Sequence, residues 1–152
     1  MKKFLKGFVY AGRGFVTALY ERNFRFHLCA AAIVIFVATS FYELSKAEWA
    51  VLILTIGLVI ALEALNTAIE HLADEVTREK SEHIRRCKDC AAAAVLIAAI
   101  AAVAVGIVLL GDIERLSAMW EFYSSDIWRM LSLIAAVTGA VLFVLLPERY
   151  KK

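Results

Sequence analysis

The chain has 152 residues, of which 62% are hydrophobic, and its formal net charge is +2. A soluble globular domain is about half apolar, so this excess indicates a membrane protein and argues against a water-soluble enzyme. The three cysteines do not imply a disulfide framework, and we expect no nucleic-acid partner.

The apolar residues fall into segments that predict an all-α integral membrane bundle. Residues 4–19 alternate apolar and basic residues, which is typical of an amphipathic helix in the membrane interface rather than of a cleavable signal peptide. Apolar runs follow at 28–42, 49–62, 91–110 and 127–146. Since crossing about 30 Å of hydrocarbon takes roughly 20 helical residues, the first two runs have to extend into polar flanks. We therefore predict an N-terminal interfacial helix and four transmembrane helices.

Basic residues set the predicted orientation. Lys and Arg gather before the first run, in the loop at 75–90 and after the fourth run, whereas the loops at 43–48 and 111–126 carry one basic residue each. Cytoplasmic flanks attract such residues. We expect a multi-pass protein of the bacterial inner (cytoplasmic) membrane, with both termini in the cytoplasm and an external loop at 111–126.

The second apolar run continues without a helix breaker into a stripe of polar residues. At about 100° per residue, Glu63, Asn66, Glu70 and Asp74 fall on one helix face. A solvated helix end accounts for Asp74. It does not account for Glu63, because an ionised carboxylate at the hydrocarbon boundary is costly unless it faces a partner, water or a metal. We therefore interpret Glu63 as a functional residue.

Two further groups lie at the same cytoplasmic level. Glu21 precedes the first span and, four residues before Arg25, has the spacing of a simple helical ion pair. Beside Glu70, however, it supplies the second of two carboxylates that suit Mg²⁺. Lys88, next to Asp89, opens the third span, either as a positive-inside anchor or as a contact to nucleotide phosphates, and the sequence leaves both open.

These residues together suit phosphoryl transfer, which requires positioning, a metal, positive charge and a group that deprotonates the nucleophile. Glu63 lies where a lipid hydroxyl would be, whereas Glu21, Glu70 and Lys88 face the cytosol, where ATP is. The sequence holds no Gly-x-x-x-x-Gly-Lys-Ser/Thr loop. We therefore predict a lipid kinase with an unusual nucleotide site and with ATP as co-substrate.

Four motifs in this order resemble the bacterial diacylglycerol kinase/undecaprenol kinase family. They are Ala-Gly-Arg-Gly at 11–14, Glu-Arg-Asn-Phe-Arg-Phe-His at 21–27, Glu-Ala-Leu-Asn-Thr-Ala-Ile-Glu-His at 63–71 and Lys-Asp at 88–89. The resemblance covers roughly residues 3–110, and the first two motifs look more like those of the Gram-positive undecaprenol kinases. We expect a kinase domain over 1–110, with the loop and fourth span at 111–152 lying outside the family pattern.

The resemblance implies a homotrimer with active sites shared between neighbouring protomers. It also implies roles for individual residues: the catalytic base and substrate contact at Glu63, metal and ATP ligands at Glu21 and Glu70, supporting polar positions at Asn66 and Asp74, and nucleotide contacts at Lys88, Asp89 and, as a less specific match, Tyr10. The loop at 77–83 diverges, so we assign no ligand there.

Alternative functions remain open at this point. The favoured acceptor is undecaprenol, giving undecaprenyl phosphate, and the runner-up is diacylglycerol, giving phosphatidic acid. A cation-coupled transporter subunit also uses intramembrane carboxylates. It predicts paired helices broken by Gly or Pro near the bilayer midplane, and this chain has only Gly57 and Gly106 at such depths and no proline there.

Overall fold

The computed structural model describes residues 2–76 and 81–148, and within them it forms six helices and no strand. The helices are α1 (Lys2–Ala18), α2 (Arg22–Phe41), α3 (Lys46–Val76), α4 (Glu82–Leu110), α5 (Ile113–Ser124) and α6 (Ile127–Val144). In the described chain, four of them, α2, α3, α4 and α6, are long and apolar enough to cross a membrane. This confirms the all-α membrane fold with four candidate spans.

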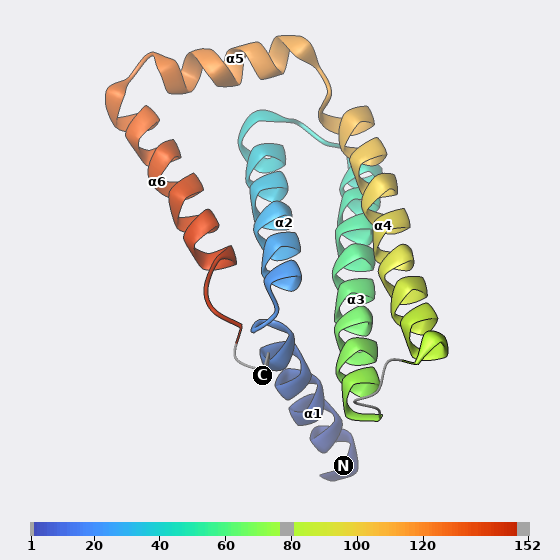
Figure 1. Ribbon diagram of the computed structural model, residues 1–152. Helices are drawn as coiled ribbons and strands as arrows, with labels where there is room; N and C mark the ends of the chain where they lie inside the picture. The colour runs from blue at the N-terminus through green and yellow to red at the C-terminus, as the bar shows by residue number, and fades with distance from the viewer. Residues whose placement is uncertain (1, 77–80, 149–152) are drawn as a thin grey trace.

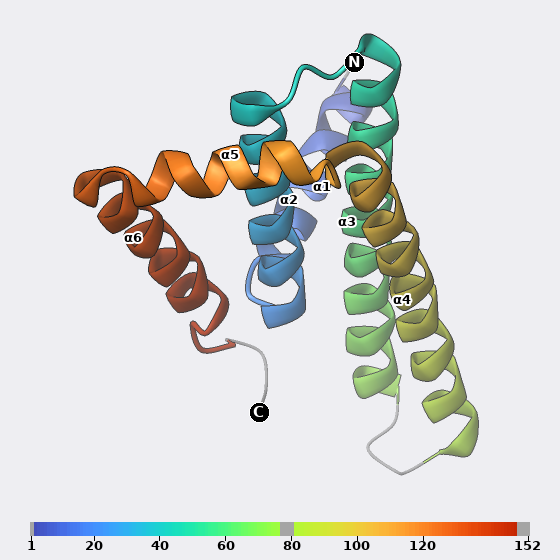
Figure 2. The ribbon, with the colours of Figure 1, turned by 90° about the horizontal axis from the view of Figure 1, so that it is seen from above.

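The four long helices lie in a row in the order α6, α2, α3, α4 (Figures 1 and 2). Within this row α3 packs most extensively on α4, and α2 contacts both α3 and α6. Small residues such as Ala38 and Ala98 are buried between the helices, which lets their backbones approach closely. Most other large apolar side chains point outward, as expected where lipid replaces water.

Helix α3 confirms that the second apolar run extends into its polar flank. Its 31 residues correspond to about 46 Å of helix at 1.5 Å per residue, longer than the roughly 30 Å hydrocarbon core. If α3 enters the bilayer near Lys46, Glu63 lies about 26 Å along the helix and Glu70 about 36 Å along it. With that entry point, Glu63 falls near the far edge of the hydrocarbon and Glu70 falls beyond it.

The segment 111–126 differs from the predicted loop, because most of it forms the helix α5. The Asp112 carboxylate caps this helix by accepting hydrogen bonds from the backbone N–H groups of Glu114 (2.9 Å) and Arg115 (3.4 Å). Arg115 donates to the Phe41 carbonyl (2.9 Å), and the Phe41 ring meets that of Phe122. Helix α5 therefore lies across the ends of the spans, at the opposite end of the molecule from α1 (Figure 1).

Gly111 makes the sharp passage from α4 to α5 possible. Its backbone N–H donates to the Ile107 carbonyl (2.9 Å), and a β-carbon at this position would overlap that same carbonyl oxygen. We expect Gly111→Ala to lower the midpoint of thermal unfolding in detergent by several degrees, corresponding to about 1–3 kcal/mol of overpacking strain.

The matched control for this prediction is Gly106→Ala in the same helix, because an added β-carbon there meets no atom within 4 Å. Circular dichroism during heating measures both variants. Equal unfolding midpoints for Gly111→Ala and Gly106→Ala would contradict the steric role given to Gly111.

Candidate active site

The buried polar residues of the described chain gather at one level of α2 and α3. They are Arg25, Glu63, Asn66 and Thr67, each at most 6% exposed. Three of them lie within five residues of α3, at the edge of the hydrocarbon. Because burying polar groups costs free energy unless they find partners, this concentration marks a site rather than a packing accident.

Glu63 faces α2 rather than lipid. Its side chain is 4% exposed, and its Oε2 lies 3.9 Å from Nε2 of His27. This separation is too long for a direct hydrogen bond but within ion-pair distance, so the imidazole stands beside the carboxylate without donating a hydrogen bond to it. A carboxylate held this way has its oxygens available to a hydroxyl group that enters the site.

A second link joins the turn before α2 to α3, between Glu63 and the C-terminal end of α3. Nε2 of His71 and Oε1 of Glu21 are 3.1 Å apart, and Asn66 donates from Nδ2 to Oε1 of Glu70 (3.1 Å). Because His71 directly follows Glu70, these contacts bring Glu21 to the level of Glu70.

Asn66 also carries an unpaired acceptor. Its buried Oδ1 has no hydrogen-bond partner in the described part of the chain. Such atoms are rare in folded proteins and call for an explanation. A donor on a bound molecule would satisfy this oxygen, which agrees with a site that is completed by its ligands.

The donor set fits a magnesium ion that takes most of its ligands from elsewhere. One oxygen each of Glu21 and Glu70 is engaged in the hydrogen bonds above, which leaves the second oxygen of each carboxylate for a cation. Over residues 2–76 and 81–148 no group of three or more His, Cys, Asp or Glu side chains forms a complete metal cage. Mg²⁺ typically uses one or two carboxylates together with substrate phosphates and water.

The structure pairs the remaining predicted residues differently. Lys88 donates from Nζ to Oδ1 of Asp74 (2.7 Å), which joins α4 to the end of the α3 stripe. Asp89 accepts from Arg85 (3.1 Å) on the surface of α4, and Tyr10 is 62% exposed on α1. A single chain therefore brings Glu21, Glu63, Asn66 and Glu70 together, but neither Tyr10 nor Asp89 joins them. Part of the segment 77–83, for which no ligand was predicted, lies outside the described residues.

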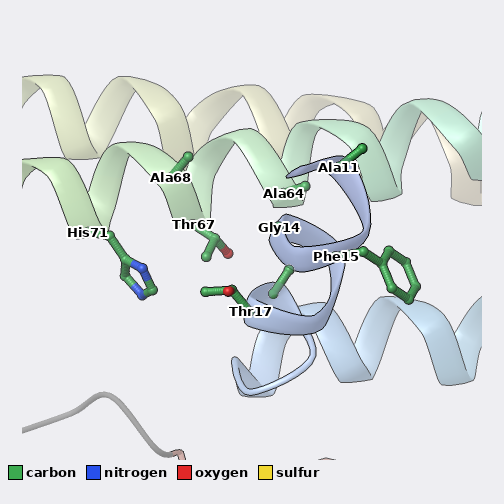
Figure 3. Close-up of a pocket in the computed structure, with 9 residues that line it drawn as sticks. Ala11, Gly14, Phe15, Thr17, Ala64, Thr67, Ala68 and His71 are labelled. Carbon is green, nitrogen blue, oxygen red and sulfur yellow. The ribbon is translucent and has the colours of Figure 1, made fainter. Parts of the chain in front are cut away.

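A groove of about 460 Å³ separates α1 from α3 beside this cluster. Its walls are mostly small or apolar, and Thr17 of α1 lies opposite Thr67 and His71 of α3 (Figure 3). Apolar walls with a few polar groups at one end suit an amphiphilic molecule. The lining residues are Ala11, Gly14, Phe15, Thr17, Ala18, Ala64, Thr67, Ala68 and His71.

Three residues in or beside the α2–α3 cluster, His27, His71 and Arg25, were given no functional role from the sequence. His27 and His71 lie inside the motifs at 21–27 and 63–71, and they are two of only three histidines in the chain, so a signal was present. Arg25, for which a pairing with Glu21 was considered, instead donates to backbone carbonyl groups. Those partners come from distant segments, and no local spacing reveals them.

The sequence comparisons identify the family of the chain. Residues 9–110 match the family described as prokaryotic diacylglycerol kinase. The chain is 42% identical over 110 residues to an undecaprenol kinase of Bacillus subtilis (strain 168), covering 72% of this chain and 89% of the relative. No solved structure matches this chain significantly.

Two other relatives match over less of their own length. A diacylglycerol kinase of Synechocystis sp. (strain ATCC 27184 / PCC 6803 / Kazusa) is 46% identical over 100 residues, which cover 65% of this chain and 56% of the relative. A diacylglycerol kinase of Haemophilus influenzae (strain ATCC 51907 / DSM 11121 / KW20 / Rd) is 38% identical over 78 residues, which cover 51% of this chain and 65% of the relative.

The family match spans more than half of the chain and includes every residue of the cluster on α2 and α3. The protein thus belongs to the prokaryotic diacylglycerol kinase family, and it is a multi-pass membrane lipid kinase.

Proposed function

We propose that this chain transfers the γ-phosphoryl group of ATP to the hydroxyl group of undecaprenol, giving undecaprenyl phosphate and ADP. The observation that supports the proposal is the burial of Glu63 on α3, where the whole residue is 3% exposed. The choice of undecaprenol is supported by the motifs at 11–14 and 21–27 and by the relative of which this chain covers 89%. Diacylglycerol is the alternative acceptor, since two other relatives are named for it.

In this mechanism Glu63 acts as the general base. Its carboxylate takes the proton from the lipid hydroxyl while that oxygen forms a bond to the γ-phosphorus. The bond between the γ-phosphorus and the bridging oxygen breaks, and ADP leaves toward the cytosol. His27, 3.9 Å away, limits the orientations of the Glu63 carboxylate.

The cytoplasmic end of the cluster receives the nucleotide. Glu21 and Glu70 would hold Mg²⁺, which when bound supplies positive charge beside the phosphate oxygens. Asn66 keeps Glu70 in place through their 3.1 Å hydrogen bond, and Lys88 offers an ammonium group to the phosphates when it exchanges its partner Asp74. Positioning by these groups provides most of what phosphoryl transfer needs from a protein.

Tyr10 and Asp89 enter the proposal through a neighbouring copy of the chain. Neither side chain joins the Glu63 cluster within one chain, and the open row of helices leaves the faces of α2 and α3 to lipid or to another protomer. A homotrimer with shared active sites would bring these residues to the nucleotide. We place the assembly in the bacterial inner membrane with both termini in the cytoplasm, because the basic residues of 75–90 mark that side.

The identity of the acceptor is tested with the purified full-length protein in mixed micelles, using labelled ATP, Mg²⁺ and one lipid at a time. Separation of the products by thin-layer chromatography measures the phosphate transferred. We expect kcat/KM to be at least tenfold higher for undecaprenol than for diacylglycerol. The reverse order makes the protein a diacylglycerol kinase, and transfer to neither lipid refutes the proposed function.

The role of Glu63 predicts the effect of a nearly isosteric substitution. Glu63→Gln should lower kcat for phosphate transfer by about 10²–10⁴-fold, the usual contribution of a general base, with little change in the KM for ATP. The matched control is Glu75→Gln, which neutralises an exposed carboxylate at the end of the same helix. A Glu63→Gln enzyme as fast as the Glu75→Gln enzyme would rule out proton removal by Glu63.

The groove between α1 and α3 is assigned to the head end of the lipid. Gly14 lines it, and a β-carbon there meets no atom within 4 Å, so Gly14→Leu should fill the groove without disturbing the helix. We expect the KM for the lipid to rise at least fivefold while the KM for ATP stays within twofold.

Gly7→Leu is the matched control for the groove, because Gly7 lies on the same helix, is equally open and does not line the cavity. Initial rates at varied lipid and varied ATP measure both constants. A selective rise in the KM for ATP would assign the groove to the nucleotide instead.

A further inference from the structure

The most deeply buried charge in the described chain has no part in the mechanism above. The Arg25 side chain is 2% exposed, and its guanidinium group donates to four backbone carbonyl groups. Nη1 donates to the carbonyls of Leu19 (3.1 Å) and Tyr20 (2.9 Å), and Nη2 donates to those of Val144 (3.0 Å) and Leu146. The Val144 carbonyl belongs to the last residue of α6, and the other three follow the ends of α1 and α6, so one side chain joins two helix ends.

The arrangement is favourable because helix C-termini carry partial negative charge and unpaired carbonyl groups. No ion pair to Arg25 occurs over residues 2–76 and 81–148, so the two helix ends supply the compensating negative charge. The planar guanidinium group carries donors on two nitrogen atoms, Nη1 and Nη2, and can therefore reach the ends of both α1 and α6. A lysine ammonium group presents its donors from a single atom.

Other contacts hold α6 against α2 along the same side. The backbone N–H of Arg22 donates to Oε1 of Glu148 (3.3 Å), Sγ of Cys29 lies 4.0 Å from the Ala140 carbonyl oxygen, and the Arg25 guanidinium lies 6.0 Å from the centre of the Phe143 ring. In both views α6 flanks α2 on the side away from α3 (Figures 1 and 2).

What Arg25 holds is the turn that presents Glu21. The carbonyls of Leu19 and Tyr20 belong to the two residues directly before Glu21. Within the turn, the backbone bonds are short-range, from Tyr20 N–H to the Thr17 carbonyl (3.1 Å) and from Glu21 N–H to the Ala18 carbonyl (2.9 Å). The Glu21 carboxylate makes no capping bond to α2 and reaches His71 instead, so its position depends on where the turn is fixed.

We propose that α6 is a positioning element of the nucleotide end of the active site and that it acts through Arg25. The helix lies outside the family match, which ends at residue 110, yet α6 and the residues directly after it supply two of the four hydrogen-bond partners of a buried arginine inside that match. By anchoring this guanidinium group, α6 fixes the turn at 19–21 and keeps Glu21 beside His71, ready for Mg-ATP. The inference rests on the proposed role of Glu21 in binding Mg-ATP.

The test compares the full-length wild type with Arg25→Gln, Arg25→Lys and Arg22→Gln. Arg22 is the matched control, because its side chain is exposed, it carries the same charge in the same turn, and its contact to Glu148 comes from the backbone. We expect Arg25→Gln to raise the KM for Mg-ATP at least fivefold, with kcat at saturating ATP and the KM for the lipid within twofold. Arg22→Gln should leave all three constants within twofold.

Arg25→Lys keeps a buried positive charge but cannot span both helix ends, so it should raise the KM for Mg-ATP by about threefold. It carries the same test if Arg25→Gln does not fold. An unchanged KM for Mg-ATP in the folded Arg25 variants, or parallel losses in kcat and both KM values, overturns the inference. An equal rise in Arg22→Gln also overturns it, because charge alone would then be responsible.

A cross-link provides a rescue. In a background with Cys87→Ala and Cys90→Ala, Ala140→Cys introduces a second thiol at the residue whose carbonyl oxygen lies 4.0 Å from Sγ of Cys29, and oxidation to a disulfide then links α6 to α2. In Arg25→Gln, oxidation should return the KM for Mg-ATP at least halfway to the wild-type value, and reduction should reverse this. An unchanged KM for Mg-ATP after oxidation, with the cross-link verified by mass spectrometry, would contradict the positioning role of α6. Wild-type protein that transfers no phosphate to any lipid refutes the proposed function instead.

Discussion

The structure depends on one costly feature, the burial of an ionisable carboxylate at the edge of the hydrocarbon. Glu63 is 3% exposed on a helix that otherwise presents apolar side chains to lipid, and its neighbours Asn66 and Thr67 are buried with it. Such a group is tolerated only where other elements face it. Helix α2 brings His27 to it, and the turn before α2 brings Glu21 to His71, so the packing of α2 on α3 is also the assembly of the site.

This constraint explains why the two ends of the site differ. In the proposed mechanism, the end at Glu63 lies beside a groove with small and apolar walls and meets a lipid hydroxyl. The end at Glu21 and Glu70 lies about 10 Å further along α3, where the proposal places Mg-ATP on the cytosolic side. A helix longer than the hydrocarbon core is thick would thus join the proposed base to the proposed nucleotide site. In the same proposal, Arg25 and α6 support this second end from the far side of α2.

The sequence predicted what depends on local periodicity and missed what depends on packing. The extension of α3 through Glu63 and Glu70 follows from an unbroken helical pattern, and so does their common face. The segment that forms α5 was predicted to be a loop. Its helix is stabilised by the Asp112 cap and by contacts of Arg115 and Phe122 with α2, and the contacts with α2 depend on packing that the local sequence does not reveal. The pairs His27–Glu63 and Glu21–His71 join residues 36 and 50 positions apart, and spacing along the chain carries no sign of them.

Proton removal from the lipid alcohol by Glu63 can be tested with a lipid analogue that carries a thiol in place of the hydroxyl group. A thiol ionises far more readily than an alcohol (a cysteine side chain near pH 8.5), so its attack on the γ-phosphorus depends less on a base. If Glu63 is the base, Glu63→Gln lowers kcat for the alcohol by at least tenfold more than for the thiol. Equal losses of kcat for the two acceptors would show that Glu63 does not remove the proton.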